Sequence, residues 1–352
     1  MNAEKGRIKT AIVGASGYSG QNLLRLLLTH PRVDLVCATS RAEEGKALDT
    51  VFPRFRGAEK LAGLAFSAPD IDAIAATGAS CAFLALPHGV AREFAGPLLE
   101  RGLRVIDLSA DFRLRDAAVY ADFYGGEHPT PELLAEAVYG LPELRAEEIR
   151  GARLVASPGC YPTSILLPLI PLLREKRIDP ASICVASGSG VSGAGKKAEA
   201  AYLFAEVNES VRAYGAPKHR HLSEIEQELS LAAGGPVRVS FVPHLLPVTA
   251  GIATTIFCEP AAGSDPGDPG GVYEAAYGAA PFVRVLGEGR FPDTKHVTGT
   301  NFIDIGWVRD ARTGRLILFS AEDNLGKGAS SQAVQSFNLM HGLPETEGLM
   351  IF

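Results

Sequence analysis

The sequence contains few cysteines, and they form no recognisable pair. There are five, scattered along the chain: Cys37, Cys81, Cys160, Cys184 and Cys258. No two have the C-x-x-C spacing of a zinc or dithiol centre, and an odd number of dispersed cysteines does not indicate a disulfide framework. Free thiols are typical of a reducing cytosol, so we expect a cytoplasmic protein.

The sequence also lacks a dense run of basic residues and a long apolar stretch. Lysine and arginine total 34 against 40 acidic residues, which gives a formal net charge of -6. No basic stripe of a nucleic-acid-binding protein is present. The apolar residues 165–173 are interrupted by two prolines and are too few to span a bilayer. The charged first ten residues do not have the pattern of a secretory signal. From the missing basic stripe and the short apolar stretch, we expect neither a nucleic acid nor a membrane as partner.

What the sequence does contain is enough apolar material for two buried cores. The chain has 352 residues, of which 46% are hydrophobic and 21% charged. This length exceeds the usual size of one domain, and the composition is that of an ordinary globular protein. We therefore expect two domains.

The first part of the chain alternates strands with helices. Short apolar runs predict strands at residues 8–13, 33–39, 81–86 and 104–108. Leucines at helical spacing predict a helix over residues 22–28. This alternation predicts an α/β domain with a parallel sheet covered on both faces.

After residue 157 the pattern changes to strands with fewer helices between them. Strands are predicted at residues 237–242, 252–257, 303–308 and 316–320. Gly, Pro and Asp are dense over residues 261–271, which predicts a surface loop, and residues 326–340 predict a closing helix. The second domain is therefore expected to be α+β.

Three glycines lie between the first predicted strand and the first predicted helix. Gly14, Gly17 and Gly20 form the pattern G-x-x-G-x-x-G, a variant of the dinucleotide fingerprint. Glycines let the backbone approach a pyrophosphate, and the following helix presents its N–H groups and positive dipole end to that anion. The alternative is a tight turn with a helix cap. Because the pattern lies inside a β-α-β unit, we expect a nucleotide site.

The end of the second predicted strand indicates which nucleotide is bound. NAD-binding proteins usually have an acidic residue there, which holds the ribose 2′-hydroxyl. This chain has Thr39, Ser40 and Arg41 instead, two hydroxyls and a cation that suit a 2′-phosphate. We therefore expect NADP or NADPH, with an ordinary surface charge as the alternative role of Arg41.

Cys160 differs from the other cysteines in its surroundings. It lies in the segment S-P-G-C-Y-P-T, between the apolar residues 154–156 and 165–173. There it would begin a helix, whose dipole and free N–H groups favour the thiolate and can hold an oxyanion. The alternative is inert core packing, which we assign to the other four cysteines. The flanking glycine and proline indicate a turn, so Cys160 is the candidate nucleophile.

The densest cluster of titratable residues is the segment H-R-H-L-S-E. It contains His219 and His221, and Glu224 follows at helical spacing. An imidazole titrates near neutral pH and can accept and return a proton. The alternative is a charged, solvated helix start. No metal is expected, because residues i and i+2 share a face only on a strand and no further Cys/His set accompanies them.

Two further segments offer groups that hold anions. Arg113 follows the predicted strand at residues 104–108, where ligands bind in open α/β sheets, and it can donate two hydrogen bonds to a phosphate or carboxylate. Residues 187–196 form a glycine-rich loop with many backbone N–H groups, but they lack the P-loop pattern. A flexible turn is the alternative for this loop.

Together these motifs resemble the N-acetyl-γ-glutamyl-phosphate reductases, the arginine-pathway branch of the aspartate-semialdehyde dehydrogenase group. The resemblance covers nearly the entire chain. It is carried by G-A-S-G-Y-S-G at Gly14, S-A-D-F-R at Ser109, S-P-G-C-Y-P-T at Ser157, S-G-V-S-G-A-G-K at Ser189, H-R-H-L-S-E at His219 and E-D-N-L-G-K-G-A at Glu322.

The resemblance implies an oxidoreductase of amino-acid biosynthesis. Such an enzyme uses NADPH to reduce N-acetyl-γ-glutamyl phosphate to N-acetylglutamate semialdehyde and releases phosphate. The family implies a Rossmann-type NADP-binding domain of residues 1–157 and 326–352, and an α+β catalytic and dimerisation domain of residues 158–325. It also implies a homo-oligomer, either a dimer or a tetramer.

The resemblance further implies a role for each matching residue. Cys160 is expected to form a thioester, with His219 as acid/base; whether His219 or His221 transfers the proton is left open. Substrate contacts are expected from Arg113, His221 and Glu224. Cofactor contacts are expected from Gly14, Ser16, Gly17, Tyr18, Ser19, Ser40, Arg41, Ser187, Gly190 and Asn324.

Two departures from the family pattern leave alternatives open. Ser223 stands where the family often has proline, and Ala250 where an arginine is expected. The loss of that cation affects how the substrate carboxylate or phosphate is recognised, but not the thiol chemistry. The same reaction on aminoadipyl or aspartyl phosphate is a separate alternative, ranked second because Tyr161, Pro162 and Thr163 resemble the arginine-pathway version. A thiol acyltransferase or hydrolase without hydride transfer, and a non-catalytic NADP sensor, are alternatives from other classes.

Overall fold

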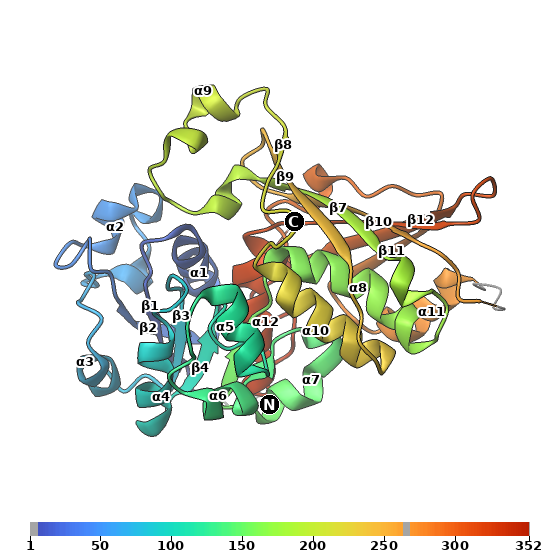
Figure 1. Cartoon of the computed structure of the whole chain (residues 1–352). Helices are drawn as coiled ribbons and strands as arrows, with labels where there is room; N and C mark the ends of the chain where they lie inside the picture. Colours follow the sequence, from blue (N-terminus) through green and yellow to red (C-terminus); the bar gives the residue numbers. More distant parts are fainter. Residues whose placement is uncertain (1–5, 263–267, 352) are drawn as a thin grey trace, which may run out of the picture. The chain divides into compact units, whose positions relative to one another are not determined.

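The computed structural model describes residues 6–262 and 268–351, which form two compact units (Figure 1). The first unit contains residues up to 117, residues 127–158 and residues 329–351. The second contains residues 118–126 and 159–328. The chain thus enters the second unit twice, briefly over residues 118–126 and again from Gly159, and it returns to the first unit at Ala329. Within the described residues, no helix has the length and apolarity that crossing a membrane requires.

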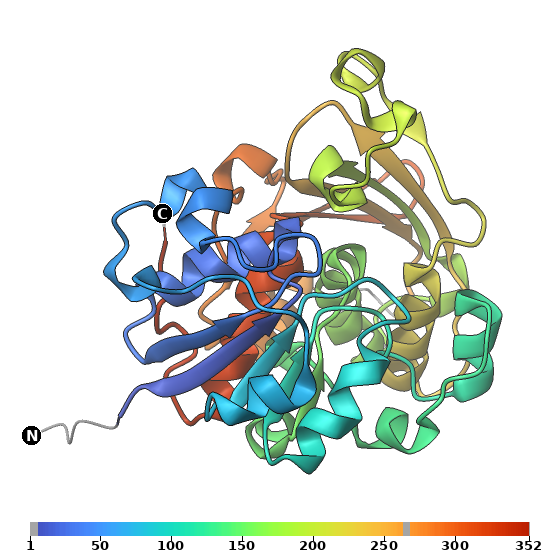
Figure 2. The same cartoon turned by 90° about the vertical axis from the view of Figure 1, so that its left-hand side faces the viewer.

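The first unit is built on a six-stranded parallel sheet in the order β2-β1-β3-β4-β6-β5 (Figure 2). Its strands are β1 (Ile8–Val13), β2 (Val33–Ala38), β3 (Cys81–Leu84), β4 (Arg104–Asp107), β5 (Val138–Tyr139) and β6 (Leu154–Ala156). The strand order reverses between β1 and β3, which is the point where open α/β sheets bind ligands. The predicted Rossmann-type fold is confirmed, and each of the four predicted strands is found.

Helices cover both faces of this sheet. One face packs against α3 (Ile71–Ala76), α4 (Arg92–Glu100) and α6 (Pro131–Glu136) in a shared apolar cluster. On the other side, α12 (Ser331–Met340) contacts α1 (Tyr18–Thr29), α7 (Pro142–Gly151) and β4. The short helix α2 (Leu48–Val51) lies in the connection after β2, and α5 (Ala117–Tyr124) belongs to the second unit from residue 118 onward.

The closing helix differs at its start from the prediction over residues 326–340. Residues Gly326–Ser330 form a π-helical turn, and the regular helix α12 begins at Ser331. The helix is anchored in the first unit by a buried hydrogen bond of 2.9 Å between His30 Nε2 and Asn338 Oδ1. Residues about three hundred positions apart therefore meet in one core.

The second unit is built on a seven-stranded mixed sheet in the order β11-β12-β13-β10-β7-β9-β8. Its strands are β7 (Cys184–Gly190), β8 (Arg212–Ala213), β9 (Ser240–Leu246), β10 (Ile252–Cys258), β11 (Val283–Glu288), β12 (Ile303–Arg309) and β13 (Leu316–Glu322). Helix α8 (Cys160–Arg174) packs on β10 and β13, with α10 (His221–Ala233) and α11 (Pro269–Tyr277) against it. The predicted α+β class is confirmed, and α9 (Phe204–Val207) lies in the connection after β7.

Two boundaries in the second unit differ from the sequence prediction. The strand predicted at residues 237–242 begins at Ser240, because the N–H groups of Val237 and Val239 donate to Ser230 and Glu226 of α10. The loop predicted at residues 261–271 ends earlier, since α11 begins at Pro269. Residues 263–267 of that loop lie outside the described residues.

Two prolines inside α8 remove backbone hydrogen bonds, and side chains replace both. Pro168 cannot donate to the carbonyl of Ser164, and Pro171 cannot donate to the carbonyl of Leu167. The hydroxyl of Ser320 donates to Ser164 O at 2.6 Å, and the hydroxyl of Tyr277 donates to Leu167 O at 2.7 Å. Side chains of the sheet and of α11 thus supply the hydrogen-bond donors that the two carbonyl groups of α8 would otherwise lack.

Replacing Tyr277 by phenylalanine leaves the Leu167 carbonyl buried without a donor. We expect the free energy of unfolding to fall by about 1–3 kcal/mol, measured by urea denaturation. Tyr273→Phe is the matched control: its hydroxyl donates to Pro168 O at 2.7 Å, a carbonyl that also faces the N–H of Leu172 one helical turn later. Equal losses in the two variants would show that the proline gap plays no part.

Candidate active site

Cys160 is the first residue of α8, directly after the turn that follows β6. Gly159 is the N-cap, with φ −68° and ψ 158°. Cys160 is half-buried, whereas Cys37, Cys81 and Cys258 are buried as predicted. The prediction of core packing is wrong for Cys184, which is exposed at the first position of β7. Burial raises the pKa of Cys81 and of Cys258 to about 12, so these thiols stay protonated and inert. Cys160 therefore begins a helix, as the sequence predicted.

Glu224 connects the start of α8 to the start of α10. Its carboxylate is 1% exposed, and its Oε2 accepts a hydrogen bond of 3.1 Å from the N–H of Gly159. Its Oε1 lies 4.0 Å from Nε2 of His221. The imidazole of His221 rests directly on Gly159, since a Cβ atom at that position would lie 2.5 Å from Nε2. Glu224 and Gly159 thus place His221 beside the residue that carries the thiol.

His219 lies in the same cluster as His221. Its Nδ1 accepts a hydrogen bond of 3.1 Å from the N–H of His221, so a neutral ring carries its proton on Nε2. Burial, and then the charge of Arg220, lower the pKa of His219 to about 4. The rings of Tyr161 and Tyr214 lie 5.7 and 5.6 Å from it. His219 is therefore a neutral, aromatic-lined imidazole near pH 7.

The nucleotide loop of the first unit uses its three glycines differently. Gly14 has φ +86°, and a Cβ there would lie 2.6 Å from Ala85 O. A Cβ at Gly20 would lie 2.6 Å from the backbone of Ala15. Around Gly17, by contrast, a Cβ would meet nothing within 4 Å. Gly14 and Gly20 are required by close packing, and Gly17 leaves open space at the helix N-terminus where a pyrophosphate would approach.

Hydroxyl groups line the end of β2 beside this loop. The hydroxyl of Ser40 donates to Ser16 Oγ at 2.9 Å, and Thr39 Oγ1 accepts from the N–H of Gly14 at 3.2 Å. Arg41 is exposed next to them. The structure thus brings together the predicted residues of the loop and of the β2 end, and their donors fit a dinucleotide with a 2′-phosphate.

Models of two protein families match the two parts of the chain. "Semialdehyde dehydrogenase, NAD binding domain" matches residues 9–152, and "Semialdehyde dehydrogenase, dimerisation domain" matches residues 160–324. A curated N-acetyl-gamma-glutamyl-phosphate reductase from Akkermansia muciniphila is 61% identical over 98% of this chain and 99% of its own length. One from Citrifermentans bemidjiense is 51% identical over 97% and 98%. The chain belongs to the N-acetyl-gamma-glutamyl-phosphate reductase family.

Solved structures share the fold of this reductase at low identity. Aspartate semialdehyde dehydrogenase II from Vibrio cholerae, complexed with ASA, gives a TM-score of 0.71 at 20% identity, over 96% of this chain and 99% of that one. The enzyme from Candida albicans with NADP gives 0.70 at 14% identity, over 96% and 99%. These likenesses confirm the architecture predicted for both domains.

The predicted cofactor residues of the second unit are engaged in contacts within it. Ser187 is 1% exposed and its hydroxyl lies 2.5 Å from that of Thr254. Gly190 donates its N–H to the carbonyl of Gly251 at 2.9 Å. Asn324 accepts from the N–H of Gly251 at 2.8 Å and donates to Ser192 Oγ at 2.9 Å. A contact of these residues with nicotinamide stays a prediction, and their visible role is to fix the glycine-rich loop.

Arg113 is buried in the first unit and contacts the turn that leads to Cys160. Its Nε donates to Ser157 O at 2.7 Å, and its Nη2 donates to Leu108 O at 3.0 Å. Nearby, burial and then the charge of Asp111 raise the pKa of Asp107 to about 7. The guanidinium of Arg113 therefore ties the end of β4 to the turn after β6, and its contact with a substrate phosphate stays a prediction.

Gly328 lies against the thiol residue and beside Glu322, a contact that the sequence does not predict. A Cβ at Gly328 would lie 2.7 Å from Cys160 Cβ and 3.0 Å from Oε1 of Glu322. Glu322 is fully buried. Both belong to the motif E-D-N-L-G-K-G-A, but only the fold shows that this motif closes over the start of α8.

Replacing Gly328 by alanine pushes a methyl group into Cys160. We expect roughly a 10²-fold loss of kcat in the semialdehyde assay, because a shift of about 1 Å in the reacting geometry costs that much. Gly151→Ala is the control, since a Cβ there meets nothing within 4 Å. Full activity in a folded Gly328→Ala variant would contradict this packing role.

Proposed function

We propose that this chain reduces N-acetyl-γ-glutamyl phosphate to N-acetylglutamate semialdehyde and phosphate with NADPH, as a step of arginine biosynthesis. The observation that carries the proposal is the half-buried Cys160 at the start of α8, with His221 resting on the adjacent Gly159. The family membership supports the acyl-phosphate substrate, and the loop around Gly17 supports the nucleotide.

Cys160 is proposed to act as the nucleophile. Its thiolate attacks the acyl carbon, the C–O bond to phosphate breaks, and a thioester forms. The N-terminus of α8 favours the thiolate, and its N–H groups stabilise the oxyanion of the tetrahedral intermediate. The helix is held in place by Ser320 and Tyr277, so the sulfur is presented from a rigid element.

His221 is proposed as the acid/base, in preference to the initial assignment to His219. The imidazole of His221 lies against Gly159, the residue before the thiol, and the carboxylate of Glu224 lies 4.0 Å from its Nε2. His219 has its Nδ1 occupied and its pKa lowered to about 4, so it does not take up a proton near pH 7. His221 accepts the thiol proton before attack and returns a proton when the aldehyde is released.

NADPH is proposed to bind at the loop between β1 and α1. The open side of Gly17 would take the pyrophosphate, and Ser40 with Arg41 would hold the 2′-phosphate. When bound, NADPH supplies the hydride that converts the thioester to the aldehyde level. The chain's own part is to hold the acyl group on Cys160 until that transfer.

The substrate is tested by running the reaction in reverse. We expect NADP reduction by N-acetylglutamate semialdehyde that requires phosphate, with aspartate semialdehyde a poor substrate. A preference for aspartate or aminoadipate semialdehyde would show that the substrate is the corresponding aspartyl or aminoadipyl phosphate instead. Acyl transfer from the thioester without any NADPH binding would select a thiol acyltransferase.

We also propose that the chain forms a homo-oligomer through the seven-stranded sheet. Thr255, Phe257, Ile317 and Phe319 are half-exposed, on the sheet face opposite the buried residues that α8 covers. The matching family model is described as a dimerisation domain. Sedimentation at micromolar concentration is expected to give a dimer or a tetramer, and a monomer would contradict the proposal.

A further inference from the structure

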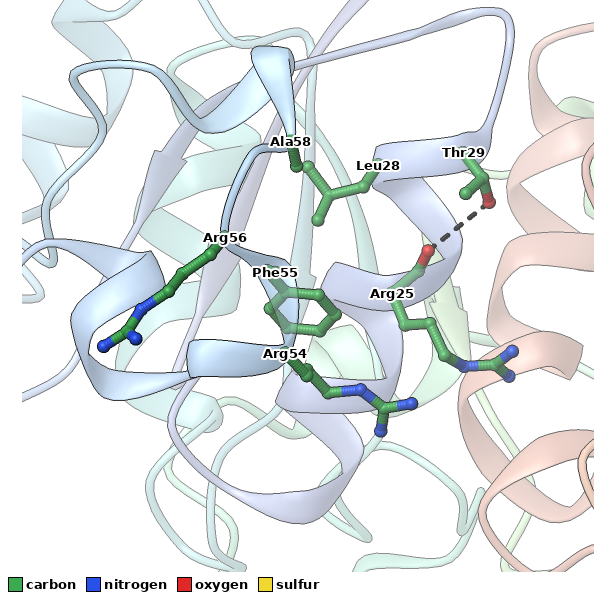
Figure 3. A pocket seen from close by; sticks show the side chains of 7 residues that line it. All are labelled: Arg25, Leu28, Thr29, Arg54, Phe55, Arg56 and Ala58. Carbon is green, nitrogen blue, oxygen red and sulfur yellow. Dashed lines mark hydrogen bonds between the residues drawn. The ribbon is translucent and has the colours of Figure 1, made fainter.

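A hollow of about 280 Å³ lies between α1 and residues 54–58 of the first unit (Figure 3). Its Arg25 is engaged within α1, because its Nε donates to Asn22 Oδ1 at 3.0 Å. Its Arg54 lies over the ring of Phe55, with the guanidinium carbon 5.8 Å from the ring centre. The more exposed apolar surface is on the second unit, where Phe204 is the most exposed large apolar side chain that the structure describes.

Phe204 belongs to an arm, residues 196–213, that leaves the seven-stranded sheet after β7 and returns to it at β8 (Figure 1). The arm contains a helical turn at Ala200–Tyr202, followed by α9. The Nη2 of Arg212 donates to the carbonyl of Ala201 at 2.7 Å, which closes the arm at its base. The arm therefore has a shape of its own, held by its own hydrogen bonds.

The tip of the arm is apolar and exposed. Phe204 is 83% exposed, Val211 61% and Leu203 59%. Because Arg212 is bonded to Ala201, Val211 lies near the turn that carries the other two. Val207 is the only buried side chain among residues 203–211. Single exposed apolar side chains are common, but three large ones in one short segment mark an interaction surface.

The outward face of the seven-stranded sheet is a second apolar surface. Across its three central strands, β7, β10 and β13, the outward positions that are exposed or half-exposed carry no charge. They are Cys184, Ala186, Gly188, Ala253, Thr255, Phe257, Ile317 and Phe319, which together form the open sheet face. The exposed ring of Phe291 lies 5.2 Å from the ring of Phe319 and extends this face. A face of this kind is normally covered.

The arm and the open sheet face lie on the same side of the second unit. In Figures 1 and 2, α8 lies on one side of the seven-stranded sheet and the segment of α9 on the other, the side that α8 leaves uncovered. Two sheets packed face to face lie about 10 Å apart, so an arm that extends beyond the plane of one sheet reaches the other copy. The family model described as a dimerisation domain spans residues 160–324, which include both the arm and the face.

We propose that the tip of the arm docks on the open sheet face of a second copy of this chain, whose own arm docks on the first copy in the same way. The proposal rests on the homo-oligomer proposed above and assigns the residues that hold it together. Phe204 and Leu203 supply apolar side chains, and the face offers aromatic and aliphatic side chains with no charge to desolvate. The contact removes both apolar surfaces from water.

Sedimentation equilibrium of the full chain over a dilution series tests the docking. Phe204→Asp is expected to raise the dissociation constant of the dimer by roughly 100-fold or more, because each of two equivalent contacts loses an aromatic anchor and gains a charge. Leu231→Asp is the matched control, since Leu231 is 49% exposed on α10, which packs on α8 at the covered side of the sheet. That replacement should change the constant by no more than about twofold.

The outcomes separate the docking from the homo-oligomer itself. A dimer that the two variants leave equally stable would overturn the docking while the homo-oligomer remains. A chain that is monomeric at every concentration would overturn both.

Photo-crosslinking identifies the surface that the tip contacts. The chain with p-benzoylphenylalanine in place of Phe204 is irradiated as an equal mixture of unlabelled and isotope-labelled copies, and the linked peptides are analysed by mass spectrometry. We expect the arm to be linked to peptides of β10 or β13, with mixed isotope pairs that only two different copies can give. Links confined to one copy, or to residues outside the open sheet face of the second copy, would overturn the proposal. A semialdehyde assay on the same samples reports the proposed reaction separately.

Discussion

Cys160→Ser is expected to lower phosphate-dependent NADP reduction by N-acetylglutamate semialdehyde by roughly 10³-fold or more. A serine hydroxyl is far less ionised and less nucleophilic than a thiol, so the thioester no longer forms. The replacement changes one atom at the N-terminus of α8 and leaves Gly159, Glu224 and His221 in place. The loss should appear in kcat, with NADP binding unchanged.

A second cysteine provides the control for this prediction. Cys184 is exposed at the start of β7, and Cys184→Ser should retain activity within about twofold. Near-normal turnover by the Cys160→Ser variant would contradict the mechanism, because nothing else in the proposal forms a covalent bond to the acyl carbon.

His221→Gln is expected to lower kcat by roughly 10²- to 10⁴-fold, the usual contribution of a positioned acid/base. Glutamine keeps most of the volume that packs on Gly159 but cannot accept and return a proton. The loss should be greatest at neutral pH and should shrink as the pH rises, since hydroxide ionises the thiol without help. The measurement is kcat against pH from 6 to 9.

His219→Gln separates the two imidazoles. His219 is neutral throughout that pH range, because its pKa is lowered to about 4, so its replacement should leave the shape of the profile unchanged. We expect kcat to fall far less than in His221→Gln, because the replacement only disturbs the packing of the aromatic rings around His219. A larger loss in His219→Gln, with a missing limb in its profile, would assign the proton transfer to His219.

The fold could be predicted where short segments determine the geometry. The pattern from β1 through Gly14 to α1 placed the parallel sheet and the nucleotide loop, because the positive φ of Gly14 and the tight contact of Gly20 are local requirements. The same holds for Cys160, whose helix start is encoded by the glycine before it and the apolar run after it.

The side-chain contacts and residue roles that the sequence did not predict depend on residues distant in the chain. The sequence gives no sign that Tyr277 and Ser320 replace the hydrogen bonds lost at Pro168 and Pro171. Asn324 was expected at a cofactor, yet its amide holds Gly251 and Ser192, which are more than seventy residues away. The two histidines could not be ranked from sequence, since the burial that lowers the pKa of His219 and the packing of His221 on Gly159 appear only in the fold.

The most direct test of the central claim is to look for the acyl group on the sulfur. The purified chain is incubated with N-acetyl-γ-glutamyl phosphate without NADPH, quenched in acid and analysed by peptide mass spectrometry. We predict one acyl group on the peptide that contains Cys160, released by hydroxylamine and absent from Cys160→Ser. An unmodified Cys160 after this incubation, or an acyl group on another residue, would contradict the account.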